Sequence, residues 1–134
     1  MKNLSFSGLP RILVIDDEEV LLRALERWLS RSFDVATCSS AEVALGLIRD
    51  GQVFDVVLCD IMLAGMSGMV FEGELTLRHP EVRRRLIFMT GGALTSEARA
   101  FIDSPSRVTL DKPLDFGALA NAVSSILESH GPAY

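Results

Sequence analysis

Four short polar segments of this chain carry residue types that could together handle a phosphoryl group. They are Asp16-Asp17, Asp60, Thr90-Gly91 and Lys112-Pro113, and each one ends or directly follows an apolar run. Carboxylates can bind a hard divalent cation or act as a nucleophile, whereas a hydroxyl and an ammonium can hold phosphoryl oxygens. Brought to one place, these groups would form a metal-assisted phosphoryl site.

The apolar runs before these segments are typical of buried strands. They cover residues 12–15, 56–59, 86–89 and 108–110. In an open parallel sheet, the carboxyl ends of neighbouring strands line one crevice, which is where such folds place their chemistry. The pattern therefore predicts that the four polar segments meet at one edge of a sheet.

Segments with helical spacing of apolar residues alternate with the strands. We predict helices at about 18–30, 69–78 and 96–103, a further helix that ends before Gly51, and a last helix that Asp115 caps. Residues 34–38 are predicted to form a fifth strand. Ser39 and Glu42 match a capping box at the start of the second helix. Strands this uniformly apolar must be covered on both faces, so we expect an α/β fold with a parallel sheet between helices.

The bulk properties fit a single globular domain. The chain has 134 residues, is 49% hydrophobic and carries a net charge of −5, which argues against a nucleic-acid surface. We expect one domain over residues 1–134, with a core at about 11–127 and short flexible tails. We interpret Arg83-Arg84-Arg85, the one basic cluster, as a solvated loop.

Hydropathy and cysteine usage indicate the compartment. No apolar stretch approaches the roughly 20 residues of a membrane span, and the first residues lack the apolar core of a signal peptide. Cys38 and Cys59 both fall in expected strands, which favours buried reduced thiols. We expect a soluble, cytoplasmic protein.

The three carboxylates would repel one another in a shared crevice. Like charges about 4 Å apart repel by roughly 1–4 kcal/mol per pair at a surface-like dielectric, and a bound cation relieves this repulsion. A few carboxylates that leave room for water suit Mg²⁺. Alternatively, Asp16 and Asp17 merely cap the first helix, as aspartates often do. Asp60 has no helix directly after it to cap, which favours the metal site.

The same residues resemble those of a known family. Val14-Ile15-Asp16-Asp17-Glu18, the strand that ends at Asp60, Thr90-Gly91 and Lys112-Pro113, in this order, resemble the receiver domain of bacterial two-component response regulators. The resemblance covers about residues 11–127. It implies a flavodoxin-like five-stranded parallel sheet in the order 2-1-3-4-5, with helices on both faces.

The resemblance also implies roles for the site residues. Asp60 would accept a phosphoryl group from a phosphohistidine on a sensor histidine kinase or a histidine phosphotransfer protein. Asp17, Asp60 and the backbone carbonyl of Met62 would bind Mg²⁺, with Asp16 acting largely through water. Lys112 would pair with the phosphoryl group, and Thr90 would swing toward it. The protein would then be a signalling phosphoacceptor rather than an enzyme.

Three departures from the family pattern involve four positions. Ala64 stands where the family often has proline, and Thr109 stands where it usually has a tyrosine or phenylalanine that reorients on activation. Met62 and Gly92 occupy positions that influence hydrolysis of the acyl phosphate in this family. Neither has a polar side chain to hold an attacking water, so we expect slow dephosphorylation.

Several alternatives stay open. The chain is either a stand-alone regulator or the receiver of a hybrid sensor histidine kinase, in which case the parent protein could tether it to a membrane. A pseudo-receiver that serves only as an interaction module would have kept the fold and lost the chemistry. A haloacid-dehalogenase-type phosphatase needs a second aspartate two residues after the first, and Met62 stands there instead. We expect no direct contact with nucleic acid or membrane, and a homodimer is compatible with the sequence.

Overall fold

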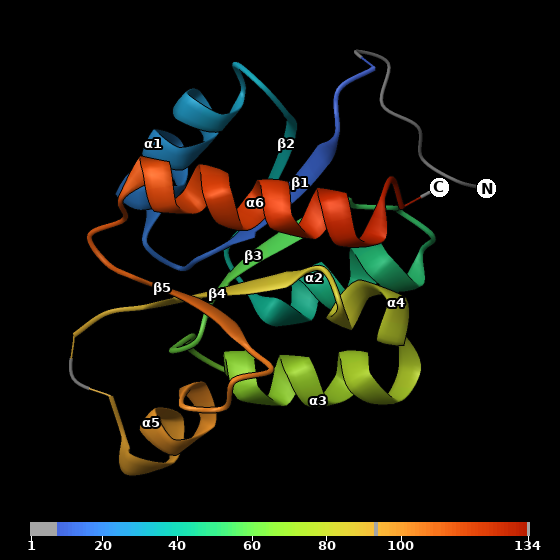
Figure 1. Cartoon of the computed structure of the whole chain (residues 1–134). Helices are drawn as coiled ribbons and strands as arrows, with labels where there is room; N and C mark the ends of the chain where they lie inside the picture. The colour runs from blue at the N-terminus through green and yellow to red at the C-terminus, as the bar shows by residue number, and fades with distance from the viewer. Residues whose placement is uncertain (1–7, 93, 134) are drawn as a thin grey trace.

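Five parallel strands form one sheet in the order β2-β1-β3-β4-β5 (Figure 1). The computed structural model describes residues 8–92 and 94–133; residues 1–7 and Tyr134, parts of the expected tails, lie outside them. The strand order confirms the flavodoxin-like fold. The strands are β1 (Arg11–Ile15), β2 (Asp34–Cys38), β3 (Val56–Asp60), β4 (Leu86–Thr90) and β5 (Val108–Asp111).

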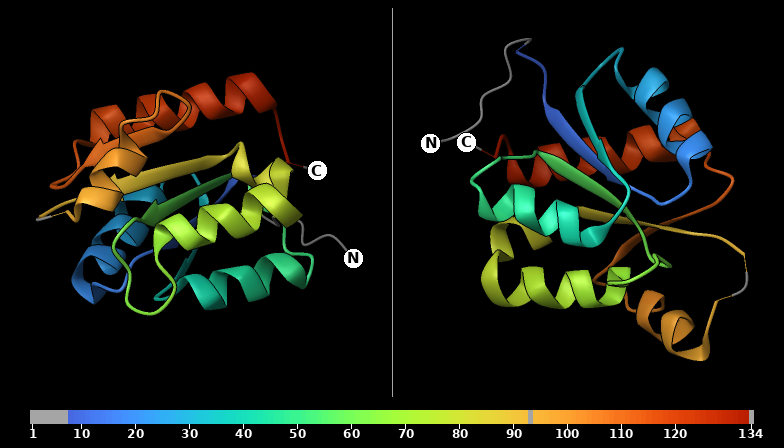
Figure 2. Two further views of the ribbon diagram at one scale, coloured as in Figure 1. Left: turned by 90° about the horizontal axis from the view of Figure 1, so that it is seen from below. Right: turned by 180° about the vertical axis from the view of Figure 1, so that it is seen from behind.

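Helices cover both faces of the sheet (Figure 2). One face packs against α1 and α6, and the other against α2 and α3, with α4 and α5 at its margin. The described helices are α1 (Glu19–Leu29), α2 (Ala41–Arg49), α3 (Gly68–Arg78), α4 (Pro80–Arg83), α5 (Ser96–Ile102) and α6 (Phe116–His130).

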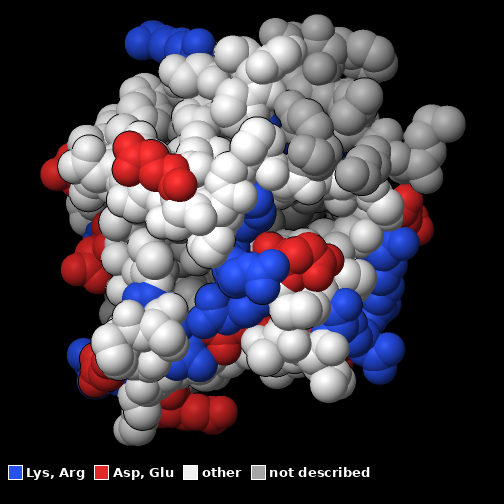
Figure 3. Space-filling model, turned by 45° about the vertical axis from the view of Figure 1, so that its right-hand side comes forward, with Lys and Arg blue, Asp and Glu red and all other residues white. Residues whose placement is uncertain are grey.

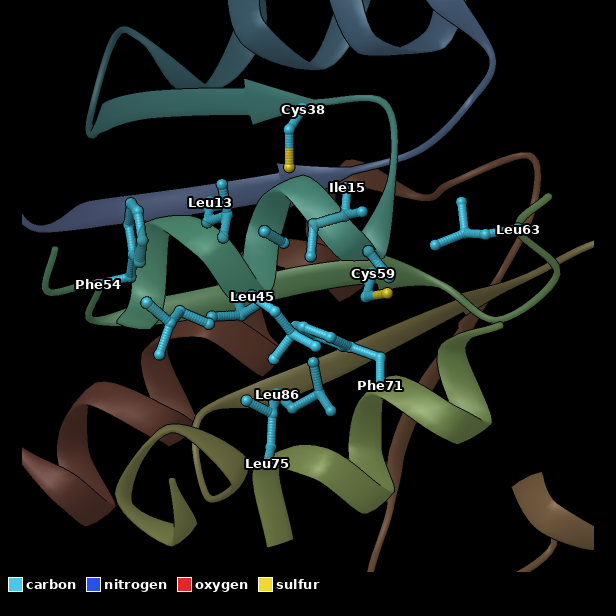
Figure 4. Close-up of a cluster of buried hydrophobic side chains, with 14 of the residues drawn as sticks. Leu13, Ile15, Cys38, Leu45, Phe54, Cys59, Leu63, Phe71, Leu75 and Leu86 are labelled. Carbon is cyan, nitrogen blue, oxygen red and sulfur yellow. The ribbon is translucent and has the colours of Figure 1, made fainter. Parts of the chain in front are cut away.

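The central strands alternate between two apolar cores. Leu13 and Ile15 of β1 point into the cluster shared with α2 and α3, whereas Ile12 and Val14 join the cluster shared with α1 and α6. Figure 4 shows the first cluster, to which α3 contributes the fully buried ring of Phe71. Because successive side chains of a strand point to opposite faces, two buried faces require continuous apolar runs, as the sequence has.

The buried cysteines are as expected. Cys38 and Cys59 are both free and buried, and both belong to the cluster in Figure 4. Burial raises the pKa of Cys38 from 9.0 to about 11 and that of Cys59 well above its usual range.

The start of the second helix differs from the expected capping box by one residue. Ser40, not Ser39, is the N-cap, and its hydroxyl accepts a hydrogen bond from the Val43 amide. Glu42 therefore stands one position too early to reach back to the cap, and its carboxylate is available to another segment.

The interpretation of residues 83–85 as a solvated loop is wrong for two of the three arginines. Arg83 ends the short helix α4 and lies 3.1 Å from the Glu72 carboxylate, while Arg85 is buried. Arg84 alone is exposed. On the face drawn in Figure 3, basic and acidic side chains lie next to one another. A charged side chain can be buried when it is paired, and carboxylates and carbonyls provide the partners of these two arginines.

The C-terminal segment is more ordered than expected. Helix α6 continues to His130, and the Ala133 amide donates a 2.8 Å hydrogen bond to Asp55. Among the described residues, no helix is both long enough and apolar enough to cross a membrane.

Candidate functional site

Three carboxylates meet at the carboxyl ends of β1 and β3. One carboxylate oxygen from each of Asp16, Asp17 and Asp60 lies within 4.8 Å of the others. Asp16 and Asp60 are buried, and Asp17 is exposed. β1 pairs directly with β3, with Ile15 beside Cys59, so the residues that follow these partners must lie close together. The predicted gathering of the three aspartates is confirmed.

Lys112 reaches the same crevice from the end of β5. Its ammonium lies 2.7 Å from Asp16 Oδ2 and 3.1 Å from Asp60 Oδ2. The Lys112-Pro113 peptide bond is cis. At Gly91 a β-carbon would lie 3.0 Å from Lys112 Cβ, so the glycine leaves room for the lysine side chain to pass.

Burial and neighbouring charges shift the pKa values of Asp60 and Lys112 at the centre of the site. Burial raises the pKa of Asp60 above its usual range, against the opposing effects of the Met62 amide and Lys112. Burial alone would lower the pKa of Lys112, but its hydrogen bonds to Asp16 and Asp60 outweigh burial and raise it. The lysine is therefore a permanent cation at neutral pH, placed against the Asp60 carboxylate.

Asp16 combines a local structural role with its place in the site. Its Oδ1 accepts a 2.9 Å hydrogen bond from the amide of Glu18, while its Oδ2 faces Lys112. Glu18 is the N-cap of α1 and makes no side-chain capping bond. The capping alternative thus describes one oxygen of Asp16 and does not account for Asp17 or Asp60.

The loop between β3 and α3 closes the site through its backbone amides. The Met62 amide donates to Asp60 Oδ1 at 3.1 Å, and the Ala64 amide donates to Asp17 Oδ2 at 3.2 Å. A proline at position 64 would have no amide hydrogen to donate. This departure from the family pattern therefore gives Asp17 a hydrogen-bond partner.

Glu42 holds the same loop from the opposite side. Its Oε2 accepts a 3.2 Å hydrogen bond from the Met66 amide. Gly65 lies between the two held amides with φ +73°, and a β-carbon there would come within 2.7 Å of Glu42 Oε2. Sequence reasoning missed this contact because it assigned Glu42 to the helix cap.

Thr90 lies at the site but its hydroxyl is engaged elsewhere. The residue is buried at the end of β4, and its Oγ1 donates a 3.0 Å hydrogen bond to Asp111 Oδ1. Asp111 precedes Lys112 and was not among the predicted site residues. An acidic residue beside the predicted lysine, on the strand next to Thr90, was the available signal.

The donor set fits a small divalent cation. Carboxylate oxygens close enough to share one ion, together with backbone carbonyls of the adjoining loop, are ligands that Mg²⁺ accepts, and the exposed Asp17 leaves an open side for water. The described cluster consists of carboxylates alone, whereas zinc sites typically include histidine or cysteine ligands.

Comparisons with known proteins point to one family. The sequence matches the response regulator receiver domain family over residues 12–124. It is 32% identical over 120 residues to the transcriptional regulatory protein ZraR of Escherichia coli K12, covering 87% of this chain but only 26% of that protein. It is 40% identical over 113 residues to the rice two-component response regulator ORR26, covering 83% of this chain and 19% of the relative. The chain thus spans about a quarter or less of these relatives.

Solved structures show the same fold. A response regulator receiver protein from Sinorhizobium medicae superimposes with a TM-score of 0.77 at 26% identity, covering 92% of this chain and 98% of that one. A structure described as an adenylate cyclase from Rhodopirellula baltica gives a TM-score of 0.78 at 28% identity over 91% of this chain and 90% of its own.

Proposed function

The chain belongs to the response regulator receiver domain family of two-component signalling, and from this premise we propose that Asp60 accepts a phosphoryl group. The observation that carries the proposal is the Lys112 ammonium, which lies within 3.1 Å of Asp60 Oδ2 inside the cluster of three carboxylates. A buried carboxylate beside a cation and a metal-type donor set is what an aspartyl nucleophile requires.

The proposed step is an in-line phosphoryl transfer from a phosphohistidine. A carboxylate oxygen of Asp60 forms a bond to phosphorus while the phosphorus–nitrogen bond breaks, and the electron pair stays on the imidazole of the donor. The product is an acyl phosphate on Asp60.

The other site residues have separate parts in the proposal. Lys112 leaves Asp60 Oδ2 and pairs with a phosphoryl oxygen. Its raised pKa keeps the ammonium charged, so the pair is a charge-assisted hydrogen bond. Thr90 supplies a hydroxyl donor to the phosphoryl group. Asp17, Asp60 and the Met62 carbonyl would hold Mg²⁺, with Asp16 acting through water. Bound there, the ion would neutralise charge on the phosphoryl oxygens.

The partner is proposed to be a sensor histidine kinase or a histidine phosphotransfer protein. Members of this family are signalling modules that work with such proteins, not classical enzymes. We place the exchange in the cytoplasm, which is consistent with two buried free thiols. The non-aromatic Thr109 favours a receiver of a hybrid sensor kinase over a stand-alone regulator. In either case, residues 1–134 would form one receiver domain.

The test is phosphorylation by acetyl phosphate, with and without Mg²⁺, followed by intact-protein mass. We expect wild type to gain one phosphoryl group only with Mg²⁺, and Asp60→Asn to gain none. Asp55→Asn is a matched control, because Asp55 is a buried carboxylate just before β3, at the end of the strand opposite Asp60. A folded wild type that forms no adduct and binds no Mg²⁺ would instead favour the pseudo-receiver.

A further inference from the structure

The hydroxyl of Thr90 has a single hydrogen, which it donates in a hydrogen bond to Asp111. Oγ1 donates to Asp111 Oδ1 at 3.0 Å. Thr90 is only 3% exposed, whereas Asp111 lies on the surface. An exposed carboxylate therefore covers a buried hydroxyl that points along the sheet toward β5.

The backbone fixes these two residues opposite each other. Thr90 and Asp111 are register partners in the parallel pair of β4 and β5. The Lys112 amide also donates to the Thr90 carbonyl at 2.6 Å. Asp111 is thus held beside Thr90 by the same strand end that delivers the Lys112 ammonium to Asp60.

The contact with Asp111 and a contact with a phosphoryl group exclude each other. A threonine hydroxyl is one donor, so it can serve either the Asp111 carboxylate or a phosphoryl oxygen on Asp60. Any transfer of the hydroxyl to the phosphoryl group must first break the bond to Asp111. A ligand shifts such an equilibrium only by its differential affinity for the two arrangements.

We propose that Asp111 is a positioning residue that holds the Thr90 hydroxyl away from Asp60 in the resting protein and so sets how strongly the site binds a phosphoryl group. This inference rests on the proposed function of Asp60. It also assigns a partner to Thr90 in a chain whose Thr109 cannot act as an aromatic switch. The exposed position of Asp111 means that its replacement leaves the core intact.

The first arm of the test uses the resting protein alone. Three-bond scalar couplings measured by NMR report the χ1 rotamer of Thr90. We expect one rotamer in wild type and in Asp111→Asn, which keeps an acceptor oxygen but loses the charge. Asp111→Ala removes the acceptor, and we expect rotamer averaging there. Averaging already in wild type would overturn the proposal.

The second arm measures binding of beryllofluoride, a phosphoryl analogue, in the presence of Mg²⁺. Because Asp111 is exposed, its hydrogen bond to Thr90 should have the net worth of an ordinary hydrogen bond, which predicts roughly three- to tenfold tighter binding for Asp111→Ala. Asp111→Asn should stay near wild type. In a Thr90→Val background, Asp111→Ala should change nothing, because there is no hydroxyl to release.

Two outcomes separate this inference from the proposed function. Equal tightening by Asp111→Ala with and without the Thr90 hydroxyl would mean that the Asp111 charge acts directly, and would overturn the positioning role. A wild type with a single Thr90 rotamer that binds no beryllofluoride would overturn the proposed function, while the resting contact would be supported.

Discussion

At the scale of single residues, we expect Met62 and Gly92 to influence how long a phosphoryl group on Asp60 would last. Met62 is 39% exposed, and its backbone amide donates a hydrogen bond to Asp60 Oδ1, so this residue is open to solvent next to the carboxylate. A thioether neither orients nor activates water. The Asp60 acyl phosphate should therefore be lost slowly, because no side chain at these two positions places the nucleophile.

The substitution Met62→Asn tests this expectation. An amide can hold a water by hydrogen bonds, so we expect the half-life of phosphorylated protein to fall roughly tenfold. Loss of the phosphoryl group is followed by intact mass after removal of acetyl phosphate. Leu77→Asn, an exposed apolar residue near the end of α3, is the control and should keep the wild-type half-life. An unchanged half-life in Met62→Asn would refute the explanation.

Cys38 offers a second prediction at this scale. Burial raises its pKa from 9.0 to about 11, which lowers its thiolate fraction at pH 8 by about a hundredfold. Alkylation by iodoacetamide at pH 8 should be at least that much slower in native protein than in urea, as read by mass. The sign follows from desolvation of the thiolate, so reaction should accelerate as the pH rises toward 11. Equal rates in the two states would contradict the burial of this thiol.

At the scale of elements, the loop between β3 and α3 is held by carboxylates on both sides. Asp17 accepts from the Ala64 amide and Glu42 accepts from the Met66 amide, each at 3.2 Å. Partners that orient a metal-ligating carboxylate typically change metal affinity by about 10–100-fold when removed. The β3–α3 loop should therefore contribute to Mg²⁺ binding through Glu42, although Glu42 would not touch the ion.

Glu42→Ala should weaken Mg²⁺ binding about tenfold by calorimetry, because the loop would no longer hold its Ala64 amide on Asp17. Glu42→Gln keeps an acceptor oxygen and should retain most of the affinity. Glu128→Ala removes one negative charge from an exposed position on α6 and serves as the charge control. If the alanine and glutamine variants of Glu42 weaken binding equally, the loss of charge and not the hydrogen bond explains the effect.

Local sequence patterns made part of the site predictable, whereas contacts between distant segments were much harder to predict. The aspartates and Lys112 could be placed because each ends a strand, and parallel strands end at one edge. The Glu42–Met66 contact could not, since it depends on a one-residue shift of a helix cap. For the Thr90–Asp111 contact the sequence offered only an acidic residue beside Lys112, because the hydrogen bond itself depends on one rotamer. β5 was expected to be buried but is an edge strand with Val108 41% exposed, which its apolar run does not reveal.

At the scale of the whole molecule, Arg85 joins the residues just before β3 and β4 to the end of α6. Its guanidinium donates to the carbonyls of Asp55 at 3.1 Å, Gly131 at 2.7 Å and His130 at 2.9 Å. Asp55 is buried as well, and its carboxylate accepts from the amides of Arg11 and Ala133. This network closes the end of the sheet opposite the carboxylate cluster. The residues that stabilise this end of the fold are therefore distant from the candidate phosphoryl site.

Arg85→Lys separates the two properties. A lysine keeps the charge but cannot reproduce the planar fork that reaches carbonyls of two elements, so buried acceptors lose their partners. We expect the free energy of unfolding in urea to fall by about 2 kcal/mol. Arg84→Lys, at the exposed neighbouring position, should change it by less than about 0.5 kcal/mol. Both variants should form the same amount of Asp60 acyl phosphate per folded molecule, since neither residue reaches the site. A loss of labelling in folded Arg85→Lys would show instead that the two ends of the sheet are coupled.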